Sequence, residues 1–368
     1  MLFMIIERFR DQDMIPVYRR VRDGGRRLPE GLKYLDSWIE PNFSRCFQLM
    51  ECDDLRLLQR WILEWRGTGV DFVHAWDTGR PGPRVMVQAL THGNEICGAI
   101  ALDWLLAQVR TAGWRPARGR LVCAFANVAA YQRFDAVHPF ASRCIDEDLN
   151  RVWADEVLLG ERDSAELRRA RELRPFVDAT ELMLDIHSMS EPCAPLMVCG
   201  TQDKNAAFAR ELGVPEILLI DTGHPAGLRM VERGGFGNKN DAKHRALLIE
   251  CGQHWEKAAA DVAIDALVRF LGLTGLADAA WVKANVRLPL PKRQRLVRVT
   301  EPVVARSAAF KFLVPTTGLS VIAKAGTPIA QDGEHVFVTP YDDTVLVMPG
   351  TNNLKPGGTA VRLGRFED

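Results

Sequence analysis

Residues 84–95 have the sequence RVMVQALTHGNE, an apolar run of strand type followed at once by a histidine and a glutamate. Residues 96–110 then have the apolar spacing of a helix. In open α/β sheets, active sites form where strands end and helices begin. His92 and Glu95 lie at such a turn, and both side chains can reach one metal ion there. Taken alone, the pattern suits equally well a loop histidine and a glutamate that favours a helix N-terminus.

The charge balance excludes some classes of protein. The chain has 368 residues, with 47 Lys+Arg against 47 Asp+Glu, so the formal net charge is zero. Generic nucleic-acid and membrane-surface binders usually carry a basic excess, so we expect neither partner. No apolar run approaches the roughly 18–20 residues that span a bilayer, and the first residues lack the pattern of a secretory signal. None of the eight cysteines forms a CxxC pair, so we expect reduced thiols in a cytoplasmic protein.

The middle of the chain alternates apolar strand patterns with helical patterns. We predict strands at 84–90, 121–126, 182–186, 196–199, 216–220 and 246–249, and helices at 96–110, 205–212 and 257–271. This alternation is typical of a layered α/β domain with a mostly parallel sheet. We assign the domain to residues 84–284, after a linker rich in glycine and proline at 77–83.

The first 76 residues form a segment of their own. Strand patterns at 2–9, 32–39, 45–51 and 70–76 and helical patterns at 14–22 and 54–65 give the order βαββαβ, which predicts a ferredoxin-like α+β domain. Such sheets often pair face to face, so a homodimer is one role that we expect. Trp38, Trp61 and Trp65 could line a ligand pocket, but we expect them in a core or an interface.

Two further strands end in residues that carry chemistry. LMLDIHS at 182–188 places His187 at a strand end, where it supplies a third ligand for a catalytic zinc. Asp185 points to the same face of that strand and can orient a ligand histidine. ALLIECG at 246–252 places Glu250 at another strand end, where it could act as a general base. Each of these residues, taken alone, also suits an ordinary polar strand terminus.

The segment RCIDEDLNR, residues 143–151, sets two arginines near an asparagine. Arginine binds carboxylates through two parallel hydrogen bonds and can stabilise a developing oxyanion. Arg143 and Arg151 are therefore candidates for substrate contacts, although a charged surface loop would have a similar sequence.

The motifs HGNE, RCIDEDLNR, DIH and IECG together resemble those of the aspartoacylase and succinylglutamate desuccinylase family, in the wider zinc carboxypeptidase superfamily. The resemblance covers about residues 84–368. It implies a zinc-carboxypeptidase-like α/β/α core at 84–284 and an all-β barrel-sandwich cap at 285–368. Residues 1–76 resemble a small bacterial domain of unknown function.

The resemblance also implies a role for individual residues. It makes His92, Glu95 and His187 the ligands of one Zn²⁺ per chain, and Glu250 the general base. Arg143 polarises the scissile carbonyl, while Asn150 and Arg151 hold the α-carboxylate of the substrate. The supporting residues it implies are Asp148 and Asp185, which orient other groups, and Tyr341, which comes from the C-terminal domain.

The implied activity is that of a zinc-dependent amidohydrolase, which removes an acyl group from a small N-acyl amino acid. Aspartoacylases carry an arginine about ten residues before the base, where it binds a side-chain carboxylate. Asn240 occupies that position here, and Lys239 or Lys243 is its nearest substitute. Two alternatives stay open: a metallocarboxypeptidase for short peptides, and a small-molecule-binding protein with a vestigial zinc site.

Residues 285–368 also suggest a biotinyl or lipoyl carrier, because short strands are broken there by glycine and proline. A carrier needs a lysine with Met-Lys-Met-like flanks at a hairpin tip. Lys324 precedes Ala325-Gly326 and lacks such flanks. We therefore expect a non-carrier cap that narrows the cleft.

Overall fold

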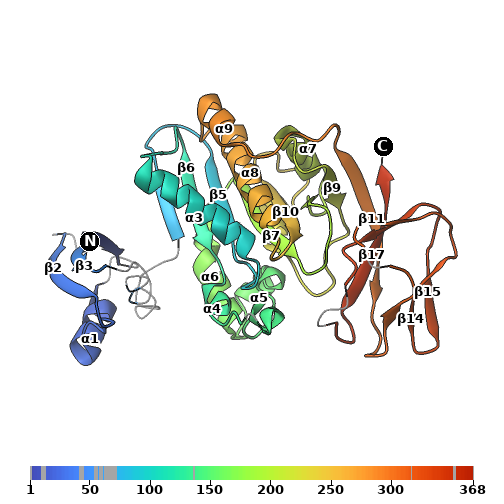
Figure 1. Ribbon diagram of the computed structural model, residues 1–368, viewed down its shortest axis with the longest axis horizontal. Coiled ribbons are helices and arrows are strands. Elements are labelled where there is room, and N and C mark those ends of the chain that lie inside the picture. Colours follow the sequence, from blue (N-terminus) through green and yellow to red (C-terminus); the bar gives the residue numbers. More distant parts are fainter. Residues whose placement is uncertain are drawn as a thin grey trace. The chain divides into compact units, whose positions relative to one another are not determined.

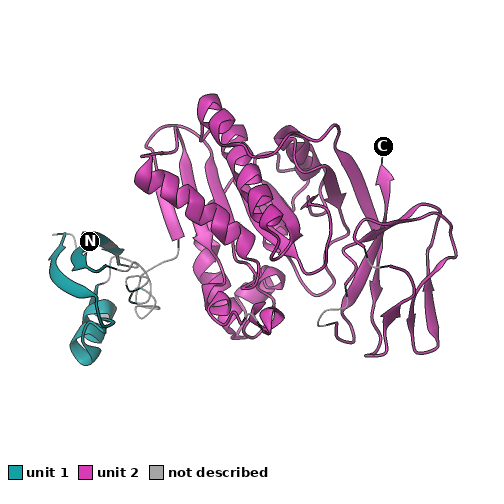
Figure 2. Cartoon of the chain, in the orientation of Figure 1, with its two compact units in different colours: residues 1–72 teal, residues 73–368 magenta. Residues whose placement is uncertain are grey.

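The computed structural model describes residues 2–9, 14–40, 45–53, 57, 61, 73–135, 137–315, 317–350 and 354–367. The chain divides into two compact units, residues 1–72 and 73–368, which Figure 2 shows in different colours. Each unit has its own buried core and is described by itself.

The described part of the first unit is a three-stranded antiparallel sheet with a helix. The sheet order is β1-β3-β2, and the elements are β1 (Leu2–Arg8), α1 (Ile15–Gly24), β2 (Lys33–Ile39) and β3 (Arg45–Glu51). Trp61 is buried in this core, as expected, and its Nε1 donates a hydrogen bond to the Arg26 carbonyl oxygen. Trp38 is 48% exposed. The helix predicted at 54–65 lies, with Trp65, largely outside the described residues.

One predicted strand belongs to the other unit. The pattern at 70–76 was assigned to the N-terminal domain, but β4 (Val73–Asp77) pairs antiparallel with β6 (Arg120–Phe125) in the large sheet. That assignment is wrong. The physical reason is packing, because Val73 and Trp76 lie against the two cores of the second unit.

The second unit is built on an eleven-stranded mixed sheet. At its centre β5 (Arg84–Ala89), β6, β7 (Leu182–Met189) and β10 (Arg245–Gln253) are parallel neighbours in the order β10-β7-β5-β6. Next to β10, β8 (Leu196–Val198) runs antiparallel to it, and β9 (Ile217–Ile220) runs parallel to β8. The α/β sheet predicted from the sequence is therefore present and parallel at its centre, but as a whole it is mixed rather than mostly parallel.

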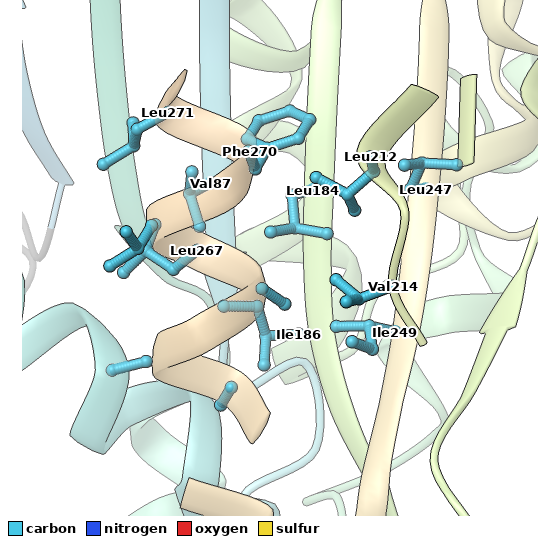
Figure 3. Close-up of a cluster of buried hydrophobic side chains, with 14 of the residues drawn as sticks. Val87, Leu184, Ile186, Leu212, Val214, Leu247, Ile249, Leu267, Phe270 and Leu271 are labelled. Carbon is cyan, nitrogen blue, oxygen red and sulfur yellow. The ribbon is translucent and has the colours of Figure 1, made fainter. Parts of the chain in front are cut away.

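Side chains alternate between two cores, one on each face of the sheet. Val87, Leu184 and Ile249 point to one face; Figure 3 shows Val87 and Leu184 near Leu267 and Phe270 of α8, and Ile249 beside Val214. Met183 and Leu248 point to the other face. The first face is covered by α3 (Ile96–Thr111), α7 (Asp203–Leu212), α8 (Lys257–Leu273) and α9 (Ala279–Asn285), and the second by α5 (Asp155–Leu158) and α6 (Ala165–Asp178).

The C-terminal strands continue the large sheet. β11 (Arg295–Val304) pairs parallel with β9 and antiparallel with β17 (Thr359–Glu367), as Figure 1 shows at the red end of the chain. β16 (Thr344–Val347) and β13 (Val321–Ile322) complete this edge. A separate three-stranded sheet holds β12 (Lys311–Phe312), β14 (Pro328–Asp332) and β15 (His335–Val338). As expected, the described residues after 285 form strands and no helix, but four of these seven strands extend the large sheet.

No helix in the described part of the chain has both the length and the apolar character needed to cross a membrane.

The core between the sheet and α8 gives a first prediction. Leu184 is fully buried, so Leu184→Ala should lower the free energy of unfolding by about 2–5 kcal/mol, through lost burial and the cavity left behind. Urea unfolding followed by circular dichroism measures the change. Leu290→Ala is the control, because Leu290 is 60% exposed and should cost under about 0.5 kcal/mol. Equal effects of both substitutions would contradict the packing described.

Candidate metal centre and active-site cleft

The carboxyl ends of β5 and β7 bring the candidate metal ligands together. These strands are parallel neighbours, with Ala89 beside Ile186, so the residues that follow each strand emerge at one edge of the sheet. Leu90 has a φ of 57°, a left-handed conformation that costs energy for a branched side chain and turns the chain out of β5. His92 and Glu95 follow this turn, and His187 lies in β7.

Glu95 is the centre of the ligand cluster. One carboxylate oxygen, Oε1, lies 2.6 Å from Nδ1 of His92, and the other, Oε2, lies 2.8 Å from Nδ1 of His187. The ligand atoms of the three residues all lie within 4.8 Å of one another. All three side chains are nearly inaccessible to solvent. The sequence therefore placed these three residues correctly as one cluster.

The outer nitrogens of both histidines contact carboxylates. Nε2 of His187 lies 2.8 Å from Oδ2 of Asp185, whose Oδ1 accepts a hydrogen bond from the Thr91 hydroxyl. Nε2 of His92 lies 2.9 Å from Oδ1 of Asp148. A carboxylate behind a histidine fixes its tautomer and orients its other nitrogen towards a metal ion.

The cluster concentrates opposite charges in a buried space. Burial alone would raise the pKa of Glu95, but the positive charges on His92 and His187 outweigh it and hold that pKa well below its usual range. Burial would lower the pKa of His187, yet the carboxylates of Asp185 and Glu95 hold it well above its usual range. The site thus stabilises positive charge among its carboxylates, which is the electrostatic requirement for binding a cation.

The donor set fits a zinc ion. Two imidazole nitrogens and one carboxylate are ordinary zinc ligands, and three protein ligands leave a position open for water or substrate. The buried Oε2 of Glu250 has no hydrogen-bond partner among the described residues. A water molecule beside the cluster would give this orphaned oxygen a partner.

Glu250 faces the same cluster from the neighbouring strand. In the register of β10 and β7, Glu250 pairs with His187. Burial, followed by the negative charge of Glu95, raises the pKa of Glu250 to about 7. The structure places Glu250 beside the predicted ligands, but inside β10, which continues to Gln253, rather than at the strand end that the sequence predicts.

The loop that carries Arg143 is tied to the HGNE turn. The Gly93 N–H donates to the Arg143 carbonyl oxygen, and a Cβ at Gly93 would collide with the backbones of Ser142 and Tyr131. Only glycine permits this close approach. The guanidinium of Arg143 donates to Asp148 at 3.0 Å and to Glu95 at 3.3 Å.

Glu166 anchors the loop that carries Arg143, a role that was not predicted from the sequence. This fully buried side chain, in the first turn of α6, accepts hydrogen bonds from the backbone N–H groups of Ile145, Asp146 and Glu147. It also accepts one from the Asn127 side chain. Its sequence signal is weak, because an acidic residue after the N-cap Ser164 is common in any helix.

Asn150 and Arg151 both border the cleft, as the sequence predicted. The Asn150 side-chain oxygen accepts the Met230 N–H, which leaves the amide NH₂ as its free donor end. Arg151 donates to the Asn150 carbonyl oxygen and lies 3.9 Å from Asp148. Burial lowers the pKa of Arg151 to about 10, with Asp148 opposing and Arg143 adding to that effect.

The cluster opens into a cleft with a volume of about 490 Å³. Its walls combine the ligand cluster, the loop at 140–151, the segment 187–193 and C-terminal residues between Gly318 and Arg362. Tyr341 does not line this cleft: its hydroxyl is hydrogen bonded to Thr300 Oγ1, and Arg365 stacks on its ring. The structure therefore does not bring Tyr341 to the site, because its hydroxyl and its ring are held by Thr300 and Arg365 instead.

The residues near position 240 do not line the cleft either. Asn240 and Lys239 are exposed, and Lys243 forms an ion pair with Glu181. Four cleft residues had no role predicted from the sequence. His254 is hydrogen bonded to Ser188, and the other three are His224 and two arginines, Arg229 and Arg362. Lys324 forms an exposed ion pair with Asp342.

Comparison with known proteins agrees with this geometry. The family model "Succinylglutamate desuccinylase/Aspartoacylase catalytic domain" matches residues 81–264, which is half of the chain. The chain belongs to the succinylglutamate desuccinylase/aspartoacylase family. Residues 1–74 match a "Domain of unknown function (DUF3303)". The named enzymes of the main family are deacylating hydrolases.

Individual members of the family align with most of this chain. A succinylglutamate desuccinylase from Burkholderia lata is 27% identical over 329 residues, covering 81% of this chain and 84% of that protein. Solved succinylglutamate desuccinylases share the fold. The Vibrio cholerae structure has a TM-score of 0.60 at 18% identity, covering 80% of this chain and 87% of its own. The Chromobacterium violaceum structure has a TM-score of 0.58 at 17% identity, covering 96% and 98%.

The ligand cluster gives a second prediction. Wild-type protein should hold one zinc ion, and Glu95→Gln should lose most of it, because a central anionic donor becomes a neutral amide. Asp185→Asn should keep the stoichiometry and bind zinc about 10–100-fold more weakly, since only the orientation of His187 is affected. Elemental analysis after dialysis, with competition by a coloured chelator, measures both quantities. Full zinc content in Glu95→Gln would exclude Glu95 as a ligand.

Proposed function

We propose that this chain is a zinc-dependent deacylase that hydrolyses the amide bond of a small N-acyl amino acid. The observation that carries the proposal is the position of Glu250, whose buried carboxylate oxygen, unpartnered among the described residues, adjoins the His92–Glu95–His187 cluster. A carboxylate with a raised pKa beside a metal site is suited to exchange protons during a reaction.

A zinc ion on His92, Glu95 and His187 would polarise the acyl carbonyl and increase the acidity of a water molecule. Glu250 removes one proton from the attacking water, whose oxygen forms the new bond to the acyl carbon. As the carbon–nitrogen bond breaks, Glu250 returns that proton to the departing amine. The products are a carboxylic acid and a free amino acid, and Glu250 ends in its starting state.

Arg143 stabilises the negative charge that develops on the carbonyl oxygen. Its guanidinium borders the cleft and is held by Asp148 and Glu95, so its direction is set before the substrate binds. Burial would lower the pKa of Arg143, but the charges of Asp148 and Glu95 raise it above its ordinary value. A fixed cation of this kind stabilises a developing charge without reorganising during the reaction.

Arg151 and the Asn150 amide NH₂ bind the α-carboxylate of the amino acid. Both groups border the cleft beside Arg143, on the same loop. An arginine and an amide donor provide the charge and the fixed geometry that carboxylate recognition needs.

The dimensions of the cleft favour a small substrate over a peptide. Its volume of about 490 Å³ lies in the range of small-molecule sites. Met348, Leu354 and Thr359 of the C-terminal region form part of its wall, which narrows the approach to the metal centre.

Amine release from a panel of compounds tests the proposal. The panel holds acetyl, succinyl and formyl amides of acidic, basic and apolar amino acids, with short peptides as the alternative substrates. We expect zinc-loaded protein to release free amine from succinylated or acetylated amino acids, and a strong chelator to abolish the release.

Release of C-terminal residues from the peptides alone would instead favour a metallocarboxypeptidase. Tight binding without turnover anywhere in the panel, from protein shown to carry zinc, would favour a binding protein.

Substitution of the base gives a further prediction. Glu250→Gln should lower kcat about 10²- to 10⁴-fold, because the amide cannot carry the proton, while zinc content and substrate binding remain. Steady-state kinetics and elemental analysis measure these two effects together. Turnover near the wild-type rate in a zinc-loaded variant would remove Glu250 from its assigned role.

A further inference from the structure

Arg362 is a cleft arginine without a protein partner among the described residues. Arg143 and Arg151 lie against Asp148, and Arg229 donates to both Asp221 and Glu232. Arg362 borders the same cleft, yet its side chain makes no hydrogen bond or ion pair within the described parts of the chain. Lys355, which also borders the cleft, is exposed, whereas Arg362 is partly buried. Of these described cleft cations, Arg362 alone is partly buried and forms no ion pair.

The sheet fixes the direction of the Arg362 side chain. Arg362 lies in β17 between two strands, opposite Val347 of β16 and Pro302 of β11. Its sequence neighbours Val361 and Leu363 point to the other face, into the core against the small β12-β14-β15 sheet. Because side chains alternate along a strand, Arg362 faces the cleft. A residue held on both sides by a ladder cannot turn away to solvent as a loop residue can.

The charges around Arg362 are mixed, and none of the described acids lies close enough to form an ion pair with it. Burial lowers the pKa of the Arg362 guanidinium; Asp221, Glu250 and Glu232 oppose this effect, and Arg229 adds to it. Burial, and then the charges of Arg151, Arg362 and Arg229, lower the pKa of His224 to about 3, so this histidine stays neutral. Asp221 and Glu232 are already bonded to Arg229. Because no described acid forms an ion pair with Arg362, an anion from outside the protein can bind its guanidinium directly.

Arg362 stands where two cavities meet. Together with Arg151 and His224 it borders both the cleft and an adjoining cavity of about 920 Å³. A ligand whose α-carboxylate is held by Arg151 therefore has room to extend another group towards Arg362. Asn240 and Lys243, the sequence candidates for such a contact, do not reach the cleft.

We propose that Arg362 determines substrate specificity by binding a second carboxylate of the acylated amino acid. This inference rests on the proposed deacylase function. A guanidinium can take such a carboxylate through two parallel hydrogen bonds, and a substrate without it would leave Arg362 partly buried and unpaired. The carboxylate belongs either to the acyl group, as in succinyl, or to the side chain of the amino acid, as in glutamate.

Four substrates distinguish these two sources: N-succinylglutamate, N-succinylglutamine, N-succinamoylglutamate and N-succinamoylglutamine. Glutamine replaces the side-chain carboxylate of glutamate by an amide, and the succinamoyl group replaces the terminal carboxylate of the succinyl group in the same way. Each replacement leaves the size of the substrate nearly unchanged. Arg362→Gln should lower kcat/KM roughly 10- to 100-fold for the substrates that carry the recognised carboxylate, and leave the amide analogues nearly unchanged. If the loss follows the succinyl carboxylate, Arg362 recognises the acyl group. If it follows the glutamate side chain, Arg362 recognises the amino acid. Arg362→Lys should restore part of the loss, because it keeps the charge but not the paired donors.

Arg365→Gln is the matched control. Arg365 lies on the same strand and is exposed, and its side chain stacks on Tyr341 outside the cleft. This variant should retain wild-type kcat/KM for all four substrates. Circular dichroism and thermal unfolding of both variants confirm that the sheet is intact.

Calorimetric binding to the zinc-loaded Glu250→Gln protein gives a readout without turnover. The recognised substrate should bind with a dissociation constant roughly 10- to 100-fold lower than that of its amide analogue, and Arg362→Gln in this background should remove the difference. Equal effects of Arg362→Gln on all four substrates, or no effect on any, would overturn the inference. Wild-type protein that hydrolyses none of the four but binds them with this dependence on Arg362 would overturn only the proposed deacylation.

Discussion

The parallel register of three strands is the constraint on which the site depends. β5, β7 and β10 lie side by side in one direction, so that the ends of all three meet at one edge of the sheet. The register sets Glu250 opposite His187 and places the HGNE turn directly next to them. A slip of one residue in β10 would turn Glu250 to the other face of the sheet and bring an apolar neighbour to the metal cluster.

The two cores maintain this register, because each strand buries alternate side chains on opposite faces. The cost of placing ionisable groups at the carboxyl edge is offset by pairing within the cluster. Glu95 contacts both histidines, and Asp148 and Asp185 contact their outer nitrogens. Glu250 differs from these carboxylates, since its buried Oε2 has no partner among the described residues. The Asn94 side chain at the cleft wall likewise has no partner among the described residues, so the polar network is complete around the ligand cluster but open at the cleft.

The C-terminal strands contribute to the cleft wall as well as to the fold. Because β11 pairs with β9, β17 is a continuation of the catalytic sheet. Arg362 is consequently held against the cleft by the same ladder that extends the core. A sequence-based division into a catalytic domain and a cap does not suggest this, since it treats the second part as a lid.

The sequence by itself determined the local elements, the strand-end motifs and the family, because these depend on apolar periodicity and on residues close together in the chain. His92, Glu95, His187 and Glu250 were identified in this way, as was the alternating α/β pattern. The partners of β4 and of β11, the cleft position of Arg362 and the absence of Tyr341 from the cleft wall were decided only by the tertiary structure. Strand pairing joins segments far apart in sequence, and an isolated strand pattern carries no information about which edge it will join. An arginine within a strand likewise has the same local sequence whether it faces water or a binding cleft.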